Sequence, residues 1–283
     1  MKNKKKQIIY GIASIALLMT GYFIYEHIMF VETDNAQVEA PTVMLAAKIS
    51  GYLKEVKIVE GQKVKKDEVL IQIDNRDYQS AYDAVKSDLL SLEARKNDAE
   101  KNYRRLKELY AQSVVSSQQY DTVTANYNEI KARYDSTSAK LVQAQLNLEN
   151  TTIKAPSDGF IARKSAEVGQ LAAPGSPLIG FVSLERRWIT ANFKETEIAN
   201  IKVGKTVDIK IDALPGKKYS GEIESISSAT GATFTLLPPD NATGNFTKVV
   251  QRVPVKIKFK NLSIEDIETI QAGLSAVVKV HIH

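Results

Sequence analysis

The sequence of 283 residues contains no cysteine, a single tryptophan and three histidines. The absence of cysteine excludes disulfides, iron–sulfur clusters, cysteine-ligated zinc and thiolate nucleophiles. No Ser-His-Asp set, phosphate-binding loop or H-E-x-x-H motif is present. His281 and His283 would share one face of a strand, but two histidines without a third ligand are typical of a protein surface. We therefore expect no enzymatic activity, no cofactor and no metal site.

An excess of positive charge is also missing once the N-terminus is set aside. The chain has 38 basic and 33 acidic residues, which gives a net charge of +5. Four of the basic residues are Lys2, Lys4, Lys5 and Lys6, and the rest of the chain is nearly neutral. A nucleic-acid partner therefore lacks its usual electrostatic support, and we expect none.

One long uncharged run lies near the N-terminus. Residues 8–25 carry no charge, and at ~1.5 Å per residue a helix of this length measures about 27 Å, close to the ~30 Å hydrocarbon thickness of a bilayer. The lysines before the run and Glu26 after it predict a cytoplasmic N-terminus. A cleaved signal peptide is the alternative, but no small-x-small cleavage site follows Tyr25. Residues 1–30 are therefore predicted to be a cytoplasmic tail and a single-pass membrane anchor, with the bulk of the chain exported.

Glycine and proline are both absent between Arg76 and Asn150, where eleven basic residues balance eleven acidic ones. Two runs of mostly apolar residues alternate there between steps of three and four, which predicts two helices facing each other in a left-handed coiled coil. Between the runs, Ser116 and Gln119 fit a capping box for a second helix. Residues 75–150 are thus predicted to form an antiparallel helical hairpin rather than two amphipathic helices on a globular core. The first run comprises Tyr78, Tyr82, Val85, Leu89, Leu92, Lys96, Ala99, Tyr103, Leu106 and Tyr110, and the second Tyr120, Val123, Tyr127, Ile130, Tyr134, Thr137, Leu141, Ala144 and Leu148.

Two short segments on either side of this hairpin repeat one another. GYLKEVKIVEGQKVKKDEVLIQI (51–73) and GFIARKSAEVGQLAAPGSPLIGF (159–181) align at a constant offset of 108 residues. Both are short apolar runs with glycines at equal spacing, which is typical of compact β-structure with tight turns. One half alone would expose a hydrophobic face, so we expect the two halves to close on each other. The residues that recur are Gly51, Gly61, Gln62 and Leu70, which match Gly159, Gly169, Gln170 and Leu178.

The C-terminal third contains short β-prone runs separated by turn clusters. Apolar residues alternate with polar ones in TVDIKI (206–211) and VPVKIKF (253–259), as a half-buried antiparallel strand requires. Several such strands indicate a small barrel or sandwich. The other runs are WITANF (188–193), YSGEIESI (219–226) and AVVKVHI (276–282).

Together these patterns resemble a known family. The two segments are similar to the half-motifs of biotinyl and lipoyl carrier domains. The order half, hairpin, half resembles the HlyD-like membrane fusion proteins, which are the periplasmic adaptors of efflux and secretion machines. TDNAQV (33–38), APSDGFI (155–161) and TLLPPDNATGNFTKVVQRVPVKI (235–257) resemble signatures of the EmrA branch, adaptors for fourteen-helix drug antiporters of the major facilitator superfamily. EmrA-like adaptors commonly carry a longer hairpin than this one, which leaves open how far the present hairpin reaches.

The resemblance implies a mainly β fold with a long α-helical coiled-coil hairpin. An N-terminal transmembrane helix would precede a lipoyl-like β-domain that is split by the hairpin, and a C-terminal β-barrel would follow. We expect the lipoyl-like domain over residues 41–74 and 151–185, and the barrel over residues 31–40 and 186–283. A cofactor-carrying subunit is the alternative from another class. In carrier domains, however, the modified lysine lies in the tight turn that the hairpin replaces here, so the attachment site has no equivalent.

The end of the hairpin carries the candidate functional residues. Arg105, Leu109 and Ser116 resemble the R-x-x-x-L-x-x-x-x-x-x-S pattern by which adaptors of this superfamily dock on TolC-like outer-membrane channels. A guanidinium can bond to carbonyls or carboxylates of a channel helix, and a leucine can supply an apolar contact. Taken singly, a solvated arginine, a leucine beside the seam and a capping serine would also explain these residues. Their joint spacing favours docking.

The function that the resemblance implies is mechanical. The chain would be the periplasmic adaptor of a tripartite pump for multidrug export, linking an inner-membrane, EmrB-like transporter of the major facilitator superfamily to a TolC-like outer-membrane channel. It would lie in the inner membrane and self-associate into a homo-oligomeric ring or funnel. The alternative is an adaptor of an ABC-type exporter of peptides or proteins, and the neighbouring transporter gene would distinguish the two.

Overall fold

The computed structural model describes Met19, residues 29–230 and residues 250–282. The described chain forms two compact units, one made of the residues up to Thr42 and from Val182 onwards, the other of Val43–Phe181. The predicted transmembrane helix at residues 8–25 lies outside the described residues, apart from Met19. Within the described ranges, no helix is both long and apolar enough to cross a membrane. The stretch at 235–249 of the EmrA-like segment is also outside them.

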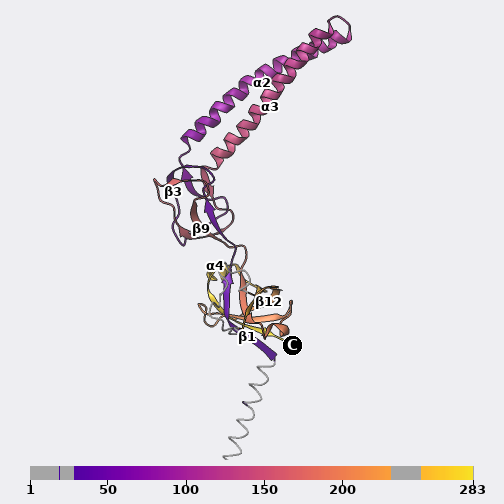
Figure 1. Ribbon diagram of the computed structural model, residues 1–283. Helices are drawn as coiled ribbons and strands as arrows, with labels where there is room; N and C mark the ends of the chain where they lie inside the picture. The colour runs from indigo at the N-terminus through magenta and orange to yellow at the C-terminus, as the bar shows by residue number, and fades with distance from the viewer. Residues whose placement is uncertain (1–18, 20–28, 231–249, 283) are drawn as a thin grey trace, which may run out of the picture. The chain divides into compact units, whose positions relative to one another are not determined.

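The unit Val43–Phe181 contains two four-stranded sheets and the helical hairpin (Figure 1). One sheet has the order β2-β9-β7-β4 and the other β6-β5-β3-β8. The 108-residue repeat holds at the level of strands, because β3, β4 and β5 recur as β7, β8 and β9, with β9 two residues longer than β5. The strands are β2 (Thr42–Ala46), β3 (Gly51–Val56), β4 (Lys63–Val64), β5 (Val69–Ile73), β6 (Thr152–Lys154), β7 (Gly159–Lys164), β8 (Leu171–Ala172) and β9 (Pro177–Ser183).

The two halves of this sandwich exchange their short middle strands. β4 of the first half pairs with β7, and β8 of the second half pairs with β3. The N–H of Leu53 donates to the Gln170 carbonyl at 2.9 Å, and at the equivalent place the N–H of Ile161 donates to the Gln62 carbonyl at 3.0 Å. The exchange confirms that the two repeated segments close on each other.

The sandwich encloses one apolar core to which both halves contribute. Repeat-related pairs such as Leu53 with Ile161 and Leu70 with Leu178 are fully buried there. The turns between the strands use Gly61 and Gly169, whose φ angles are +81° and +85°. Only glycine adopts this left-handed conformation at little cost, which explains why glycine recurs at both positions.

The hairpin consists of α2 (Arg76–Ala111) and α3 (Ser117–Glu149), which pack against each other along their length. Every residue of the two seam runs is at least partly buried except Tyr110, which is 42 % exposed. β5 and β6 are adjacent antiparallel strands, and the two helices continue directly from their ends. The predicted coiled-coil hairpin is therefore confirmed, and the alternative of two helices on a globular core is wrong.

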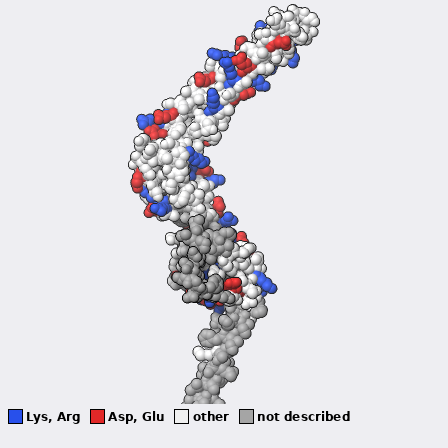
Figure 2. Space-filling model, viewed as in Figure 1, with Lys and Arg blue, Asp and Glu red and all other residues white. Residues whose placement is uncertain are grey.

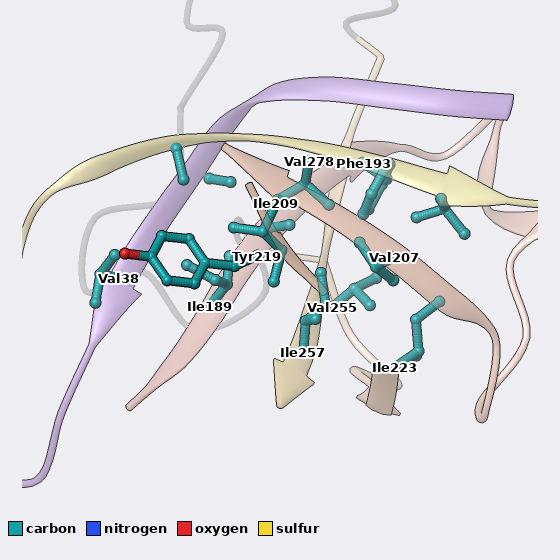
Figure 3. Packing of buried hydrophobic residues seen from close by; sticks show 14 of the residues in the cluster. Val38, Ile189, Phe193, Val207, Ile209, Tyr219, Ile223, Val255, Ile257 and Val278 are labelled. Atoms are coloured by element: carbon teal, nitrogen blue, oxygen red, sulfur yellow. The ribbon is translucent and has the colours of Figure 1, made fainter. Parts of the chain in front are cut away.

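The other unit is a closed six-stranded barrel of order β1-β10-β13-β12-β11-β14. Its inward-facing residues, which include Phe193, Ile209 and Ile257, form an apolar core (Figure 3). This confirms the predicted C-terminal β-barrel. The strands are β1 (Phe30–Glu39), β10 (Trp188–Lys194), β11 (Thr206–Ile211), β12 (Tyr219–Ile226), β13 (Arg252–Phe259) and β14 (Ser275–His281), with a 3-10 turn η1 (Ile198–Asn200) and a short helix α4 (Ile264–Thr269).

The described histidine of the C-terminal strand has a partner within the barrel wall. The Nε2 atom of His281 lies 2.9 Å from the Asp208 carboxylate, and its ring meets Phe30 edge-on at 4.9 Å. These contacts explain His281 as a residue of the barrel surface. His283 is outside the described residues.

Candidate functional site

The tip of the hairpin is a well-defined turn. α2 ends with a Schellman motif, in which the N–H of Val114 donates to the Leu109 carbonyl and the N–H of Ser113 to the Tyr110 carbonyl, both at 2.9 Å. Ser113 occupies the position that reverses the chain and has a φ of +58°. Glycine is the usual residue there, so Ser113 holds an unfavourable backbone conformation.

The second helix begins with the predicted capping box. The Ser116 hydroxyl accepts a bond from the Gln119 N–H at 3.3 Å, and the Gln119 side chain accepts one from the Ser116 N–H at 3.2 Å. Two backbone donors at the start of α3 are thereby satisfied. The turn between the helices is closed at both ends by hydrogen bonds.

Stacked tyrosines join the two helices just behind the turn. The rings of Tyr110 and Tyr120 are parallel within 5° at 4.8 Å, and those of Tyr103 and Tyr127 within 9° at 5.1 Å. The hydroxyls of Tyr103 and Tyr120 lie 3.5 Å apart, and this hydrogen bond raises the pKa of Tyr103. About two turns further from the tip, the ammonium of Lys96 lies 4.1 Å from the centre of the Tyr134 ring. The outer half of the hairpin is thus held by aromatic and cation–π contacts.

The tip carries no charge over the twelve residues from Leu109 to Tyr120. Charged residues of both signs cover the shaft of the hairpin, whereas its outermost part is uncharged in the view of Figure 2. Val114 and Tyr110 are exposed in this turn. An uncharged end with exposed apolar groups can pack against another protein at a low desolvation cost.

The three predicted docking residues all lie at this end. Arg105 is exposed, and within the described part of the chain no hydrogen bond or ion pair engages its side chain. Leu109 lies one turn further along the same face of α2 and is half-buried. Ser116 is exposed and caps α3. Leu109 and Ser116 therefore have structural roles in the turn, while Arg105 has none that the described residues reveal.

Two features of the tip are not predicted by the sequence patterns. The left-handed backbone of Ser113 gives no sequence signal, because glycine or asparagine would mark such a position and serine does not. The tyrosine stacks involve residues already placed in the seam, but the 3.5-residue period fixes only which positions face each other. The unusual number of tyrosines in the seam was the available signal.

Comparisons with protein families cover almost all of the described chain. Residues 41–182 match the model of the barrel-sandwich hybrid domain of RND-type membrane fusion proteins, and residues 188–280 match that of the YknX-like β-barrel domain. The chain is 30 % identical to the colistin resistance protein EmrA of Acinetobacter baumannii, over 98 % of this chain and 95 % of the relative. The chain belongs to the membrane fusion protein family. Proteins of this family are adaptors and not enzymes, in agreement with the prediction.

Further relatives agree with this assignment. The membrane fusion protein described here is 29 % identical to the multidrug export protein EmrA of Escherichia coli K12, over 95 % of this chain and 80 % of the relative. Among solved structures, the membrane fusion protein Spr0693 of Streptococcus pneumoniae R6 superposes with a TM-score of 0.63 at 18 % identity, covering 89 % of this chain and 97 % of that one. This likeness concerns the fold alone.

Proposed function

We propose that this membrane fusion protein is the periplasmic adaptor of a tripartite multidrug efflux pump. Its transporter would be an EmrB-like protein of the major facilitator superfamily in the inner membrane, and the hairpin tip would dock on a TolC-like outer-membrane channel. The relatives named for multidrug export and colistin resistance, similar over nearly the full chain, support the drug-efflux role. The uncharged turn at the end of the hairpin, closed by hydrogen bonds, is the observation that carries the docking role.

In this function the protein is anchored in the inner membrane by residues 8–25, with its N-terminus in the cytoplasm. Several copies would associate into a ring or funnel around the export path. The energy would come from the transporter, since the chain carries none of the nucleotide-binding or redox motifs that would supply it. A major-facilitator transporter gene beside the gene of this protein would support the proposal, whereas an ABC exporter gene would favour the peptide or protein exporter.

Arg105 provides the sharpest test of docking. Arg105→Glu reverses a charge that the folded chain leaves in solvent, so the variant should fold normally but lose contact with acceptor groups on the channel. We expect loss of drug resistance and loss of site-specific crosslinking from Ser117→Cys to the channel. The measurements are growth in the presence of drug and crosslink yield in cells that contain the transporter and the channel.

The neighbouring arginine is the matched control. Arg104→Glu makes the same charge change one residue away, on a side chain that pairs with Glu100 on another face of the helix. Its resistance should stay close to that of the wild type. Leu109→Ala should also reduce resistance, but it is a weaker test because Leu109 is half-buried within the turn. Full resistance and full crosslinking in Arg105→Glu would contradict the docking role of the tip.

A further inference from the structure

The internal repeat of the sandwich allows equivalent positions with and without a hairpin to be compared. Residues that differ between them are candidates for a role in positioning the hairpin and not in forming the β-fold. The two halves have the same strands, and the helical hairpin connects β5 of the first half to β6 of the second, whereas the equivalent neighbouring pair, β9 and β2, carries no helix. Positions that differ in chemistry between equivalent places, and that touch the base of the hairpin, are therefore candidates for positioning it. Three such residues are hydrogen-bonded to one another across β5 and β6, namely Gln72, Thr151 and Thr152.

Gln72 uses its whole amide group at the base of the hairpin. Its Nε2 atom donates to the Thr151 carbonyl at 3.2 Å and lies 3.3 Å from the Thr151 hydroxyl, while its Oε1 atom accepts from the Thr152 hydroxyl at 3.0 Å. The amide nitrogen also donates to the carbonyl of Ile73 at 3.0 Å. A glutamine with both ends engaged is fixed in one rotamer.

Thr151 extends this network into the second helix. The residue is only 1 % exposed, and its hydroxyl donates to the Leu148 carbonyl in the last turn of α3 at 2.6 Å. Its own backbone carbonyl accepts from the Ile73 N–H at 2.8 Å. A continuous set of hydrogen bonds thus runs from strand β5 through Thr151 to the end of α3.

The equivalent place, where β9 lies beside β2, has none of this chemistry. At the offset of 108 residues, Gln72 corresponds to Gly180, Thr151 to Val43 and Thr152 to Met44. The geometry is retained, because a Cβ atom added to Gly180 would lie 3.6 Å from the Met44 sulfur. Val43, by contrast, is 46 % exposed where Thr151 is buried. The sandwich therefore folds without a polar cluster where no helix leaves it.

The first helix has separate ties to the same domain. The Tyr78 hydroxyl donates to the Ser50 carbonyl at 2.7 Å, and the N–H of Asp74 donates to the Tyr52 carbonyl at 2.9 Å. The Arg76 guanidinium, hydrogen-bonded to the Asp74 carboxylate, lowers the pKa of Asp74 to about 2. These contacts hold the start of α2. If the three polar residues were removed, the end of α3 would therefore be the end that gains freedom to move.

We propose that Gln72, Thr151 and Thr152 form a clamp that fixes the direction in which the hairpin leaves the sandwich. They are positioning residues, since they act on the tip only through the orientation of α2 and α3. The backbone pairing of β5 with β6 remains without them, so the domain still folds but the hairpin gains angular freedom. The link to docking rests on the proposed function, whereas the clamp itself is a property of the fold.

The absence of cysteine allows a direct test by distance measurements between two spin labels. Lys66→Cys and Asn97→Cys place labels at exposed positions, one on a turn at the far end of β5 and one on the outer surface of α2. The full-length protein in nanodiscs should give one narrow distance distribution. Gln72→Ala should broaden it about twofold, because a pivot without its side-chain ties samples a wider range of angles. Thr152→Val should broaden it to a smaller extent, since it removes a single bond of the clamp.

Gln170→Ala is the matched control. Gln170 is a glutamine of the same sandwich whose Oε1 atom accepts from the Glu167 N–H at 3.0 Å, in a turn that does not touch the hairpin. Its distance distribution should equal that of the wild type. Equal widths for wild type and Gln72→Ala, or equal broadening in Gln170→Ala, would overturn the clamp. If Gln72→Ala fails to fold, an unchanged width in the milder Thr152→Val variant overturns it instead.

Drug resistance separates the clamp from the proposed function. If the hairpin must meet a channel in a fixed direction, the clamp variants should lose resistance in proportion to their broadening. A broadened distribution with full resistance would support the clamp and contradict the docking function. A narrow distribution with lost resistance would contradict the clamp alone.

Discussion

The sandwich and the hairpin that leaves it are stabilised in opposite ways, although they belong to one compact unit. In the sandwich, side chains such as Leu70, Ile71 and Ile179 are completely buried. In the hairpin, the only buried residue is Ala99, and the other seam residues keep part of their surface in water. A two-helix arm cannot enclose a core, because each helix has only one neighbour.

This difference assigns a separate task to each region. Within this unit the sandwich holds the buried apolar core. The geometry of the hairpin depends on local contacts, namely the tyrosine stacks, the capped turn and the polar cluster at its base. Mutations in the sandwich should therefore act on stability. Mutations in the hairpin should act mainly on shape and docking.

The largest expected effect is in the sandwich core. Leu70→Ala and its repeat mate Leu178→Ala each remove a fully buried side chain and should each lower the free energy of unfolding by about 2–5 kcal/mol. Leu89→Ala, which removes a half-buried leucine from the hairpin seam, should cost only about 1 kcal/mol. Urea unfolding followed by circular dichroism measures all three. A cost for Leu89→Ala equal to that of Leu70→Ala would show that the hairpin is as tightly packed as the sandwich.

The sequence predicts the parts of the fold in which pattern and physics coincide. The repeat could be recognised because the turns at Gly61 and Gly169 both have a left-handed backbone conformation. This conformation favours glycine, so the same residue type occurs at both equivalent positions. The hairpin could be recognised because a helix pair needs apolar residues every 3.5 positions and tolerates no proline. Ser116 and Gln119 satisfied the capping-box pattern and form it.

Other features leave no local trace. Arg187 is buried and donates to the carbonyls of Ile270 and Arg186, a role that its neighbours in sequence do not indicate. Burial lowers the pKa of its guanidinium.

Helix α4 was missed because it has six residues, too few for a hydrophobic period, although Ser263 and Asp266 form a capping box at its start. The polar cluster at the base of the hairpin depends on contacts across 79 residues between Gln72 and Thr151. Such contacts exist only once the chain has folded.

A smaller effect should distinguish the outer half of the hairpin from the sandwich. The parallel rings of Tyr103 and Tyr127 should contribute a coupling energy of about 0.5–1.5 kcal/mol beyond their buried area, measured in a double-mutant cycle with Leu at each position. Tyr103 and Tyr78 are seven turns apart on α2, so a cycle on this pair should give no coupling. Zero coupling for Tyr103 with Tyr127 would show that this stacked pair contributes no more than its buried area.

The smallest effect concerns the turn itself, where the backbone of the hairpin is least favourable. Ser113→Gly should stabilise the protein by up to about 1 kcal/mol, because Ser113 has a φ of +58° and glycine adopts this conformation without a steric penalty. The same exchange at Ser136, an exposed residue in the middle of α3, should destabilise by about 0.5 kcal/mol because the backbone there is helical. Opposite signs for the two variants in urea unfolding would confirm that the turn stores backbone strain. A destabilising Ser113→Gly would instead mean that the serine side chain contributes more to the turn than its backbone costs.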